Sequence, residues 1–367
     1  MKIGFVAPGF FTGELASGVA VLHTKVRSLF DGFLKSKHDV HLICYQWDIK
    51  YAIDNNIPYT LLSDMKDANF DVAFIPDLYI VRVLNERNES SLISAKIIGA
   101  AYDGGFPPNK FHDDEFSKRL NFLFTPSEYD AMNGRSCRPE TDVVPIGHGL
   151  PIIPTILTNP YSSEKNILYA GRFMNDINEY LNNIASSLSE YTIWLIGRKP
   201  FGNEDKHLGF TDDEFRRIFP NENIKLVAKH LGLSYEKDDR YGPLAFDEWW
   251  SWARYADCCL GIVIPGNPFH VFSKSLSYWG AGGVVVLPNN HMNVIYIRNF
   301  NGKVHATDLG MPHILNVIKE AAEMKRDHNF IASWAQSMFS WSDVIAPKII
   351  YALEQGFKAK NIEDKQV

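Results

Sequence analysis

The pattern of apolar and polar positions changes regularly along the first 150 residues. Short apolar runs alternate with longer stretches in which apolar residues recur at helical spacing, as in SGVAVLHTKVRSLFDGFLKSK at residues 17–37. Apolar runs of the kind that form buried strands lie at residues 2–8, 39–45, 70–76, 95–103, 122–127 and 142–147. This alternation predicts a parallel sheet covered by helices.

The alternation stops at a proline-rich passage and then begins again. Residues 149–165, GLPIIPTILTNPYSSEK, contain three prolines and little periodicity, which is typical of a linker. Further apolar runs and helical stretches lie at residues 166–173, 177–188, 191–200, 224–232, 255–265 and 273–288. We therefore predict an α/β protein with two doubly wound, Rossmann-like parallel-sheet domains. The predicted bounds are 1–150 for the first domain, 151–165 for the linker, 166–340 for the second domain and 341–357 for a final helix.

Doubly wound sheets bind ligands outside the carboxyl ends of their strands. In a chain with two such halves, we expect the site in a central cleft between them. The GxGxxG dinucleotide fingerprint and the Walker A sequence are absent from the chain, which disfavours a dehydrogenase or a P-loop enzyme. Gly18 opens the helix after the first strand, so that helix N-terminus is a candidate anion site, although the glycines of this loop are equally explained by its shape.

Charge and cysteine content narrow the class. The net charge is −6, and residues 1–150 carry 15 Lys and Arg against 19 Asp and Glu, so neither the chain nor its first half is a general polyanion binder. The four cysteines form no CxxC pair and are interpreted as small buried hydrophobic residues in a reducing compartment. The sequence shows no signal peptide and no apolar run of membrane-spanning length, so we expect a cytoplasmic protein, with peripheral membrane contact left open.

The second half carries the basic residues expected at a phosphate site. No Asp-x-Asp triplet occurs, so we expect donor phosphates to be held by cations and helix N-termini without a metal. Ser273 caps a predicted helix whose second residue is Lys274, a cation that disfavours a helix start unless an anion offsets it. Arg172 and Arg198 each follow an apolar strand. Each of these cations alone is typical of a solvated loop, but three at the strand ends of one domain favour a diphosphate site.

In the first half, Asp103 ends an apolar strand and is a candidate general base for an acceptor hydroxyl. Asp-Gly is also a common turn, which is the alternative interpretation. We interpret His148 and His270 as structural or loop residues. Trp249, Trp250 and Trp279 are interpreted as core aromatics, because EWWSWARYA has helical spacing.

Several of these segments, in order, resemble the landmarks of GT-B glycosyltransferases. They are DVVPIGHGLPI, NILYAGRF, WLIGRKP, SKSLSYWGAGGVVVLP and FSWSDVIAPKIIYAL, which span about residues 140–355. The resemblance implies an acceptor domain, a nucleotide-sugar domain and a C-terminal helix, containing Trp341, that crosses back onto the first domain. It also implies a UDP-sugar as donor.

The chain departs from the large retaining GT-B families, which carry a Glu-x7-Glu motif. Phe269 and Ser277 stand at those two positions. A closer similarity is to inverting xanthan-type glucuronosyltransferases, through the Gly147–Gly149 loop, the helix start with Lys274, Ser277 and Tyr278, and an Asp-Gly matching Asp103. YDGGFPP is also similar, more weakly, to a loop of phage DNA β-glucosyltransferases. This resemblance implies that Asp103 is the base of an inverting reaction.

We therefore predict a metal-independent glycosyltransferase without a cofactor, which uses a nucleotide sugar as co-substrate and a glycan or lipid-linked glycan as acceptor. The predicted donor-binding residues are Gly18, Arg172, Arg198, Tyr241, Ser273, Lys274 and Ser277, and the predicted catalytic residue is Asp103. One alternative is transfer to hydroxymethylated bases of DNA. Others are a non-catalytic GT-B scaffold that binds a nucleotide sugar and a nucleotide-sugar epimerase of the same fold.

Overall fold

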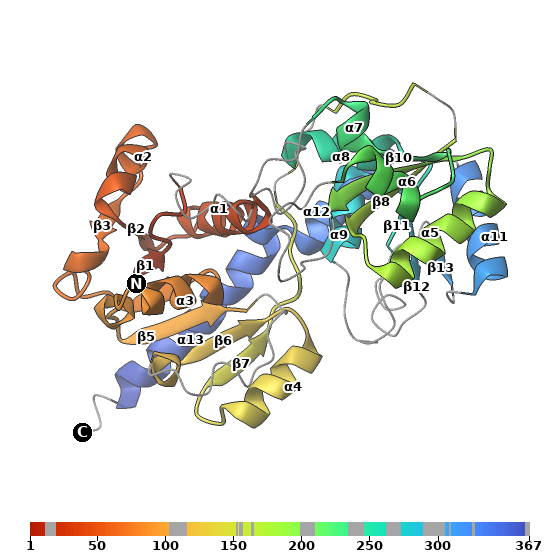
Figure 1. Ribbon diagram of the computed structural model, residues 1–367. Coiled ribbons are helices and arrows are strands. Elements are labelled where there is room, and N and C mark those ends of the chain that lie inside the picture. The colour runs from red at the N-terminus through yellow and green to blue at the C-terminus, as the bar shows by residue number, and fades with distance from the viewer. Residues whose placement is uncertain are drawn as a thin grey trace. The chain divides into compact units, whose positions relative to one another are not determined.

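The computed structural model divides into two compact units, Met1–Ile152 with Phe339–Val367 (unit 1) and Ile153–Met338 (unit 2) (Figure 1). The residues that it describes are 1–11, 20–102, 116–151, 153, 157–162, 165–198, 210–233, 246–261, 273–288, 305–307, 310–324 and 327–363. Within these residues no helix is long and apolar enough to cross a membrane.

Unit 1 is built on a seven-stranded parallel sheet with the order β3-β2-β1-β4-β5-β6-β7. Its strands are β1 (Lys2–Val6), β2 (Asp39–Cys44), β3 (Tyr59–Leu61), β4 (Val72–Ile75), β5 (Ile97–Ala101), β6 (Phe122–Thr125) and β7 (Asp142–Pro145). Its helices are α1 (Ala20–Leu34), α2 (Ile49–Asp54), α3 (Leu78–Glu86), α4 (Glu128–Cys137) and α13 (Ala346–Glu363), and a π-helix, η6, spans Trp341–Ile345. Every residue of β4 and β5 is buried, as expected for parallel strands covered on both faces.

A cluster of aromatic rings fixes α1 on the unit 1 sheet. The Phe5 ring on β1 lies 4.9 Å from Phe30 and 5.6 Å from Phe74, measured between ring centroids. Phe33 stacks on Phe74 at 4.8 Å. All four side chains are almost fully buried, so burial of their aromatic surface is a main source of stability in this unit.

The C-terminal segment packs closely against unit 1. A β-carbon at Gly32, on α1, would lie 2.5 Å from Cβ of Ala346 and 2.6 Å from the carbonyl oxygen of Ser342. A β-carbon at Gly149 would overlap the indole ring of Trp341. Figure 1 shows α13, in blue, running alongside β5. Glycine at these two positions therefore permits the close approach of the η6–α13 segment.

A buried ion pair lies beside the same segment. Lys25 Nζ, on α1, is 2.7 Å from Asp77 Oδ2, and their side chains are 5% and 9% exposed. The other carboxylate oxygen of Asp77 accepts the Tyr79 backbone N–H at 2.9 Å and so caps α3. The Lys25 ammonium also lies 5.4 Å from the Trp341 ring centroid. One buried charge pair thus connects α1, the start of α3 and the start of η6.

Unit 2 holds a six-stranded parallel sheet with the order β10-β9-β8-β11-β12-β13. Its strands are β8 (Asn166–Arg172), β9 (Thr192–Arg198), β10 (Ile224–Leu226), β11 (Cys258–Leu260), β12 (Val285–Pro288) and β13 (His305–Thr307). Its helices are α5 (Asn175–Ser187), α6 (Asp212–Ile218), α7 (Val227–His230), α8 (Phe246–Tyr255), α9 (Ser273–Ala281), α11 (Met311–Glu323) and α12 (His328–Phe339). In both sheets the first strand of the unit is central and the chain winds outward on either side. The predicted class, α/β with two doubly wound parallel sheets, is confirmed.

Side-chain burial tests two of the sequence interpretations. Trp249, Trp250 and Trp279 are 7%, 0% and 1% exposed, which confirms that they are core residues. Three cysteines are buried and free, as predicted, but Cys137 is partly exposed because it is the last residue of α4.

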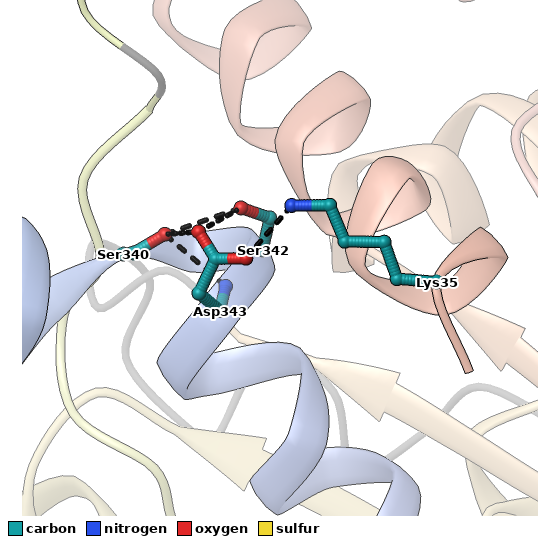
Figure 2. A network of polar contacts seen from close by, with 4 residues as sticks. All are labelled: Lys35, Ser340, Ser342 and Asp343. Carbon is teal, nitrogen blue, oxygen red and sulfur yellow. Dashed lines mark hydrogen bonds and ion pairs between the residues drawn. The ribbon is translucent and has the colours of Figure 1, made fainter.

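Figure 2 shows the polar network that begins η6 and connects it to α1. The Asp343 backbone N–H donates to Ser340 Oγ at 3.1 Å, which caps the π-helix. The Asp343 carboxylate accepts hydrogen bonds from the Ser340 and Ser342 hydroxyls and from Lys35 Nζ, the last at 2.7 Å. The hydrogen bond from Lys35, followed by those from the serines, lowers the pKa of Asp343 below its ordinary value of 3.8.

We expect the substitution Asp343→Asn to destabilise the protein more at neutral pH than in acid. Because the folded-state pKa is lowered, the carboxylate contributes fully above pH 3.8 and loses this contribution as the pH falls through the folded-state pKa. The Lys35–Asp343 pair is largely exposed, so solvent screens it, and the loss at pH 7 should be about 1 kcal/mol, mostly from the serine contacts. Urea unfolding of both proteins at pH 7 and pH 3 measures this difference.

Glu86→Gln is the matched control, because the Glu86 side chain has the same 59% exposure and forms an ion pair with Arg82, one turn away on α3. It should change the free energy of unfolding by less than about 0.5 kcal/mol. An Asp343→Asn loss that is equally large at pH 3 and pH 7 would contradict this account.

Candidate functional site

Two Gly-Arg pairs lie side by side at one edge of the unit 2 sheet. β8 ends in Gly171–Arg172 and β9 ends in Gly197–Arg198. In the parallel register Gly171 is opposite Gly197 and Arg172 is opposite Arg198. Neighbouring strands are about 4.8 Å apart, so the backbone brings two cationic residues together at the carboxyl edge, where doubly wound sheets bind ligands.

The glycines of these pairs are required by the backbone. Gly197 has φ +153°, and a β-carbon there would overlap the carbonyl oxygen of Gly171. A β-carbon at Gly171 would lie 2.6 Å from the hydroxyl oxygen of Tyr169. The close approach of the two strands therefore excludes a side chain just before Arg198, and the Tyr169 side chain fills the space beside Gly171.

Helix α9 is tied to β8 near the same edge. The β8–β11 pairing ends at Leu168, and the Ala170 backbone N–H, two residues further along, donates to the hydroxyl oxygen of Tyr278 at 2.7 Å. Tyr278 lies on α9 and is fully buried, and this burial raises its pKa well above 10. The Tyr278 hydroxyl thus accepts a β8 backbone N–H that a neighbouring strand would otherwise accept.

The hydrogen bond between Ala170 and Tyr278, called the tether here, joins β8 to α9 one turn after the start of the helix. Because α9 connects parallel strands β11 and β12, it runs back across the sheet and begins near the carboxyl edge. Lys274 precedes Tyr278 by one turn, about 6 Å along the helix axis, and is on the same face. Arg172 is two residues beyond Ala170, about 6.6 Å along β8. Lys274 and Arg172 thus each lie a short distance along their own element from the Tyr278–Ala170 hydrogen bond.

The other end of α9 is fixed by its glycines. The N–H groups of Gly282 and Gly283 donate to the carbonyls of Trp279 and Tyr278, each at 2.8 Å, and Gly282 has φ +89°. This is the Schellman arrangement that ends a helix. His328 contacts the Gly282 carbonyl at 2.9 Å, and Arg254 donates to the Ala281 carbonyl at 3.3 Å.

The electrostatics at the start of α9 favour an anion. The first turn of α9 contains no acidic residue to offset the partial positive charge of a helix N-terminus. Lys274, the second residue of α9, adds a cationic residue near this end of the helix. Two strand-end arginines and a helix start with this composition are suited to a diphosphate.

The structure describes some of the predicted site residues more completely than others. Arg172, Arg198, Ser273 and Lys274 are described in backbone only, and Ser277 is half-buried on α9. Gly18, Asp103 and Tyr241 lie outside the described residues, as does His270. β5 ends two residues before Asp103 in the chain. The register of β8 and β9 brings Arg172 and Arg198 together, and Ser273, Lys274 and Ser277 share helix α9.

A buried carboxylate in unit 1 was missed in the sequence. Asp48 Oδ2 accepts the backbone N–H groups of Gly9 at 2.7 Å and Tyr45 at 3.0 Å, which joins the loops after β1 and β2. Burial, followed by the Asp48 charge, raises the pKa of Cys44 to about 12. The only sequence signal was an Asp shortly after an apolar strand.

The Gly147–Gly149 loop is held against the C-terminal segment. Gly147 has φ +89°, and Gly149 packs on Trp341. His148 is 6% exposed, as its structural interpretation requires. Among the described residues, no group of three or more His, Cys, Asp or Glu side chains is arranged to hold a metal ion.

Comparison with known proteins identifies the fold of the chain. No family model and no curated protein matches the sequence. The structure is similar to a glycosyltransferase from Rickettsia africae, with a TM-score of 0.59 and 13% identity over 96% of this chain and 98% of that one. It is also similar to AviGT4, a glycosyltransferase of avilamycin A biosynthesis, with a TM-score of 0.55 and 12% identity over 98% of each chain.

A third similar structure is Anabaena HepE, which was crystallised with UDP and glucose. Its TM-score is 0.54, with 12% identity over 97% of this chain and 100% of that one. At these identities the similarity establishes the fold alone. The chain has the GT-B fold that these structures share.

Proposed function

We propose that the protein is a glycosyltransferase that moves a sugar from a nucleotide-diphosphate donor to a hydroxyl acceptor. The observation that carries this proposal is the carboxyl edge of the unit 2 sheet, where Arg172 and Arg198 are opposite each other. Lys274, the second residue of α9, adds a cation to a helix start that has no acidic residue in its first turn. The GT-B fold supports it, since the similar structures named above are glycosyltransferases.

Breaking the bond between the anomeric carbon and the diphosphate leaves negative charge on the phosphate oxygens. Fixed cations and helix N–H groups stabilise that charge as it develops, and they need little reorganisation during the reaction. We assign this role to Arg172, Arg198, Lys274 and the N-terminus of α9. UDP is the first nucleotide to test, because HepE binds it.

We further propose a single-displacement, inverting reaction. The acceptor oxygen forms a bond to the anomeric carbon while the bond to the diphosphate breaks and its electron pair leaves with the nucleotide. The acceptor proton passes to the carboxylate of Asp103. Phe269 and Ser277 stand where the retaining families carry glutamates, which supports inversion. The cations replace a divalent metal in this scheme.

A glycan, free or lipid-linked, is the proposed acceptor. Proteins that bind DNA neutralise several phosphates with a basic surface, whereas residues 1–150 carry more acidic than basic residues. Transfer to hydroxymethylated DNA bases is therefore the second candidate acceptor reaction. Binding of a nucleotide sugar without turnover is the alternative from another class.

We expect one nucleoside diphosphate among UDP, GDP and ADP to stabilise the protein. At a concentration of 100 times Kd a ligand stabilises by about 2.7 kcal/mol, which should raise Tm by about 5–10 °C. Arg172→Ala should weaken binding about 10- to 100-fold, because a charge-assisted contact contributes about 1.5–3 kcal/mol. Thermal shift and calorimetry measure both effects.

Arg217→Ala is the control, since Arg217 is an exposed cation in the last turn of α6 in the same unit. It should leave nucleotide affinity unchanged. If no nucleotide raises Tm, the donor proposal is wrong. If both variants lose nucleotide affinity equally, the Gly-Arg pairs do not form the donor site.

Asp103→Asn should lower the transfer rate about 100-fold or more while the nucleotide-induced rise in Tm stays the same. With UDP-sugars and a panel of oligosaccharides and hydroxymethylcytosine DNA, product formation identifies the acceptor class. The anomeric proton coupling in the product, measured by NMR, reports its configuration.

Retention of configuration, or full activity in Asp103→Asn, would contradict the mechanism. Nucleotide-sugar binding without turnover on any acceptor in the panel would favour the non-catalytic scaffold.

A further inference from the structure

We propose that Tyr278 is a positioning residue of the donor site, whose hydroxyl sets the level of the α9 N-terminus against Arg172. The inference rests on the proposed function, because it assigns to Tyr278 a part in holding the donor diphosphate. Tyr278 itself is buried in the unit 2 core and does not contact the donor. Its effect passes through the backbone that it joins.

The tether occupies a definite place in the sheet. The Asn166 carbonyl accepts the Asp257 N–H at 2.7 Å, so Asn166 directs its polar groups toward the β11 side. Ala170 is four residues further along β8, and because successive residues alternate sides, it faces the same way. β11 has ended by then, and the Tyr278 hydroxyl receives the Ala170 N–H and lies 3.5 Å from the Ala170 carbonyl. The phenol thus continues the ladder of hydrogen bonds where the strand stops.

A hydroxyl is required here because the backbone group that it satisfies is buried. Ala170 is 2% exposed, so without the phenol its N–H loses its partner away from water. The aromatic ring is held separately, with Trp249 perpendicular to it at 5.8 Å between centroids. Tyr278→Phe therefore preserves the ring and removes the one atom that connects α9 to β8 at this level.

Tyr278 is placed between the fixed end of α9 and its functional end. Gly282 and Gly283, with His328 and Arg254, hold the C-terminal end. Among the described residues, the fully buried hydroxyl of Ser275 in the first turn has no hydrogen-bond partner. A β-carbon at Gly261 would lie 2.6 Å from this hydroxyl oxygen, so the serine packs against that glycine. The Tyr278 hydroxyl bonds to β8 one helical turn after Lys274.

Unit 2 offers a matched control for this substitution. The Tyr161 hydroxyl also donates to a backbone carbonyl, that of Trp252, at 2.7 Å. Burial raises the pKa of Tyr161, as it does that of Tyr278, although Tyr161 as a whole is only half-buried. Trp252 belongs to α8, so Tyr161→Phe removes a hydrogen bond in which α9 takes no part. A general loss of stability should appear in both variants, and a positioning effect only in Tyr278→Phe.

The experiment compares the full chain with Tyr278→Phe and Tyr161→Phe. We expect both variants to lower Tm, but only Tyr278→Phe to raise the Kd for UDP, by about tenfold. The Kd for UMP, which lacks the second phosphate, should change less, so the preference for UDP over UMP falls. Calorimetry provides these values.

Hydrogen exchange without any ligand tests the tether itself. Amides of residues 273–277 should exchange at least about tenfold faster in Tyr278→Phe than in the parent and Tyr161→Phe proteins. Unchanged exchange, or an equal rise of UDP Kd in the two variants, would overturn the positioning role. Faster exchange in a protein that binds no nucleoside diphosphate would retain the tether and overturn the proposed donor site instead.

Discussion

The carbonyl oxygen of Gly171 occupies the place where a β-carbon of residue 197 would lie, so β8 and β9 can approach here only because residue 197 is glycine. The next residue on each strand is an arginine, in matched register. Parallel strands end at the same edge of a sheet, so the glycine contact fixes the relative level of two cations. Helix α9, which begins with Ser273 and Lys274, is held by the Tyr278 hydroxyl and by the Gly282–Gly283 cap at its other end. The candidate site is thus positioned by backbone contacts, and its charged side chains come from residues beyond those contacts.

Unit 1 uses a different device for the corresponding loops. A fully buried carboxylate, Asp48, takes two backbone N–H groups from the loops after β1 and β2. These two hydrogen bonds join the two loops through one buried side chain. In unit 2 the Tyr278 hydroxyl accepts the backbone N–H near the end of β8. In both units a buried polar side chain thus satisfies backbone groups near the carboxyl ends of the strands.

The sequence predicted the fold where burial is complete and the local pattern is strong. β4 and β5 are buried at every residue, and their apolar runs were identified from the sequence alone. β3 and β13 were not, because each is a three-residue edge strand without an apolar run of its own. Of the site, the sequence indicated the strand-end cations, since a basic residue after an apolar run is a local feature. The roles of all the predicted site residues, from Arg172, Arg198, Ser273, Lys274 and Ser277 to Asp103, Gly18 and Tyr241, stay predictions.

The Tyr278 tether and the Asp48 contacts were beyond the sequence for a common reason. Each satisfies a backbone N–H that has no strand neighbour, and that vacancy depends on where a neighbouring strand ends in space. Tyr278 is needed because β11 ends while β8 continues. Nothing within α9 records the length of β11. Such contacts are readable only once the register of the sheet is known.

Ser277 affects the balance of charge near Lys274 at the start of α9. It is three residues after Lys274, and residues three apart are neighbours on a helix. A glutamate at 277, as in the retaining families, would be close enough to pair with the lysine and reduce its attraction for a phosphate. Serine carries no charge, so the positive charge of Lys274 adds to the helix N-terminus instead of being offset within the helix. In the proposed donor site, serine at 277 would therefore leave the positive charge of Lys274 available to a phosphate.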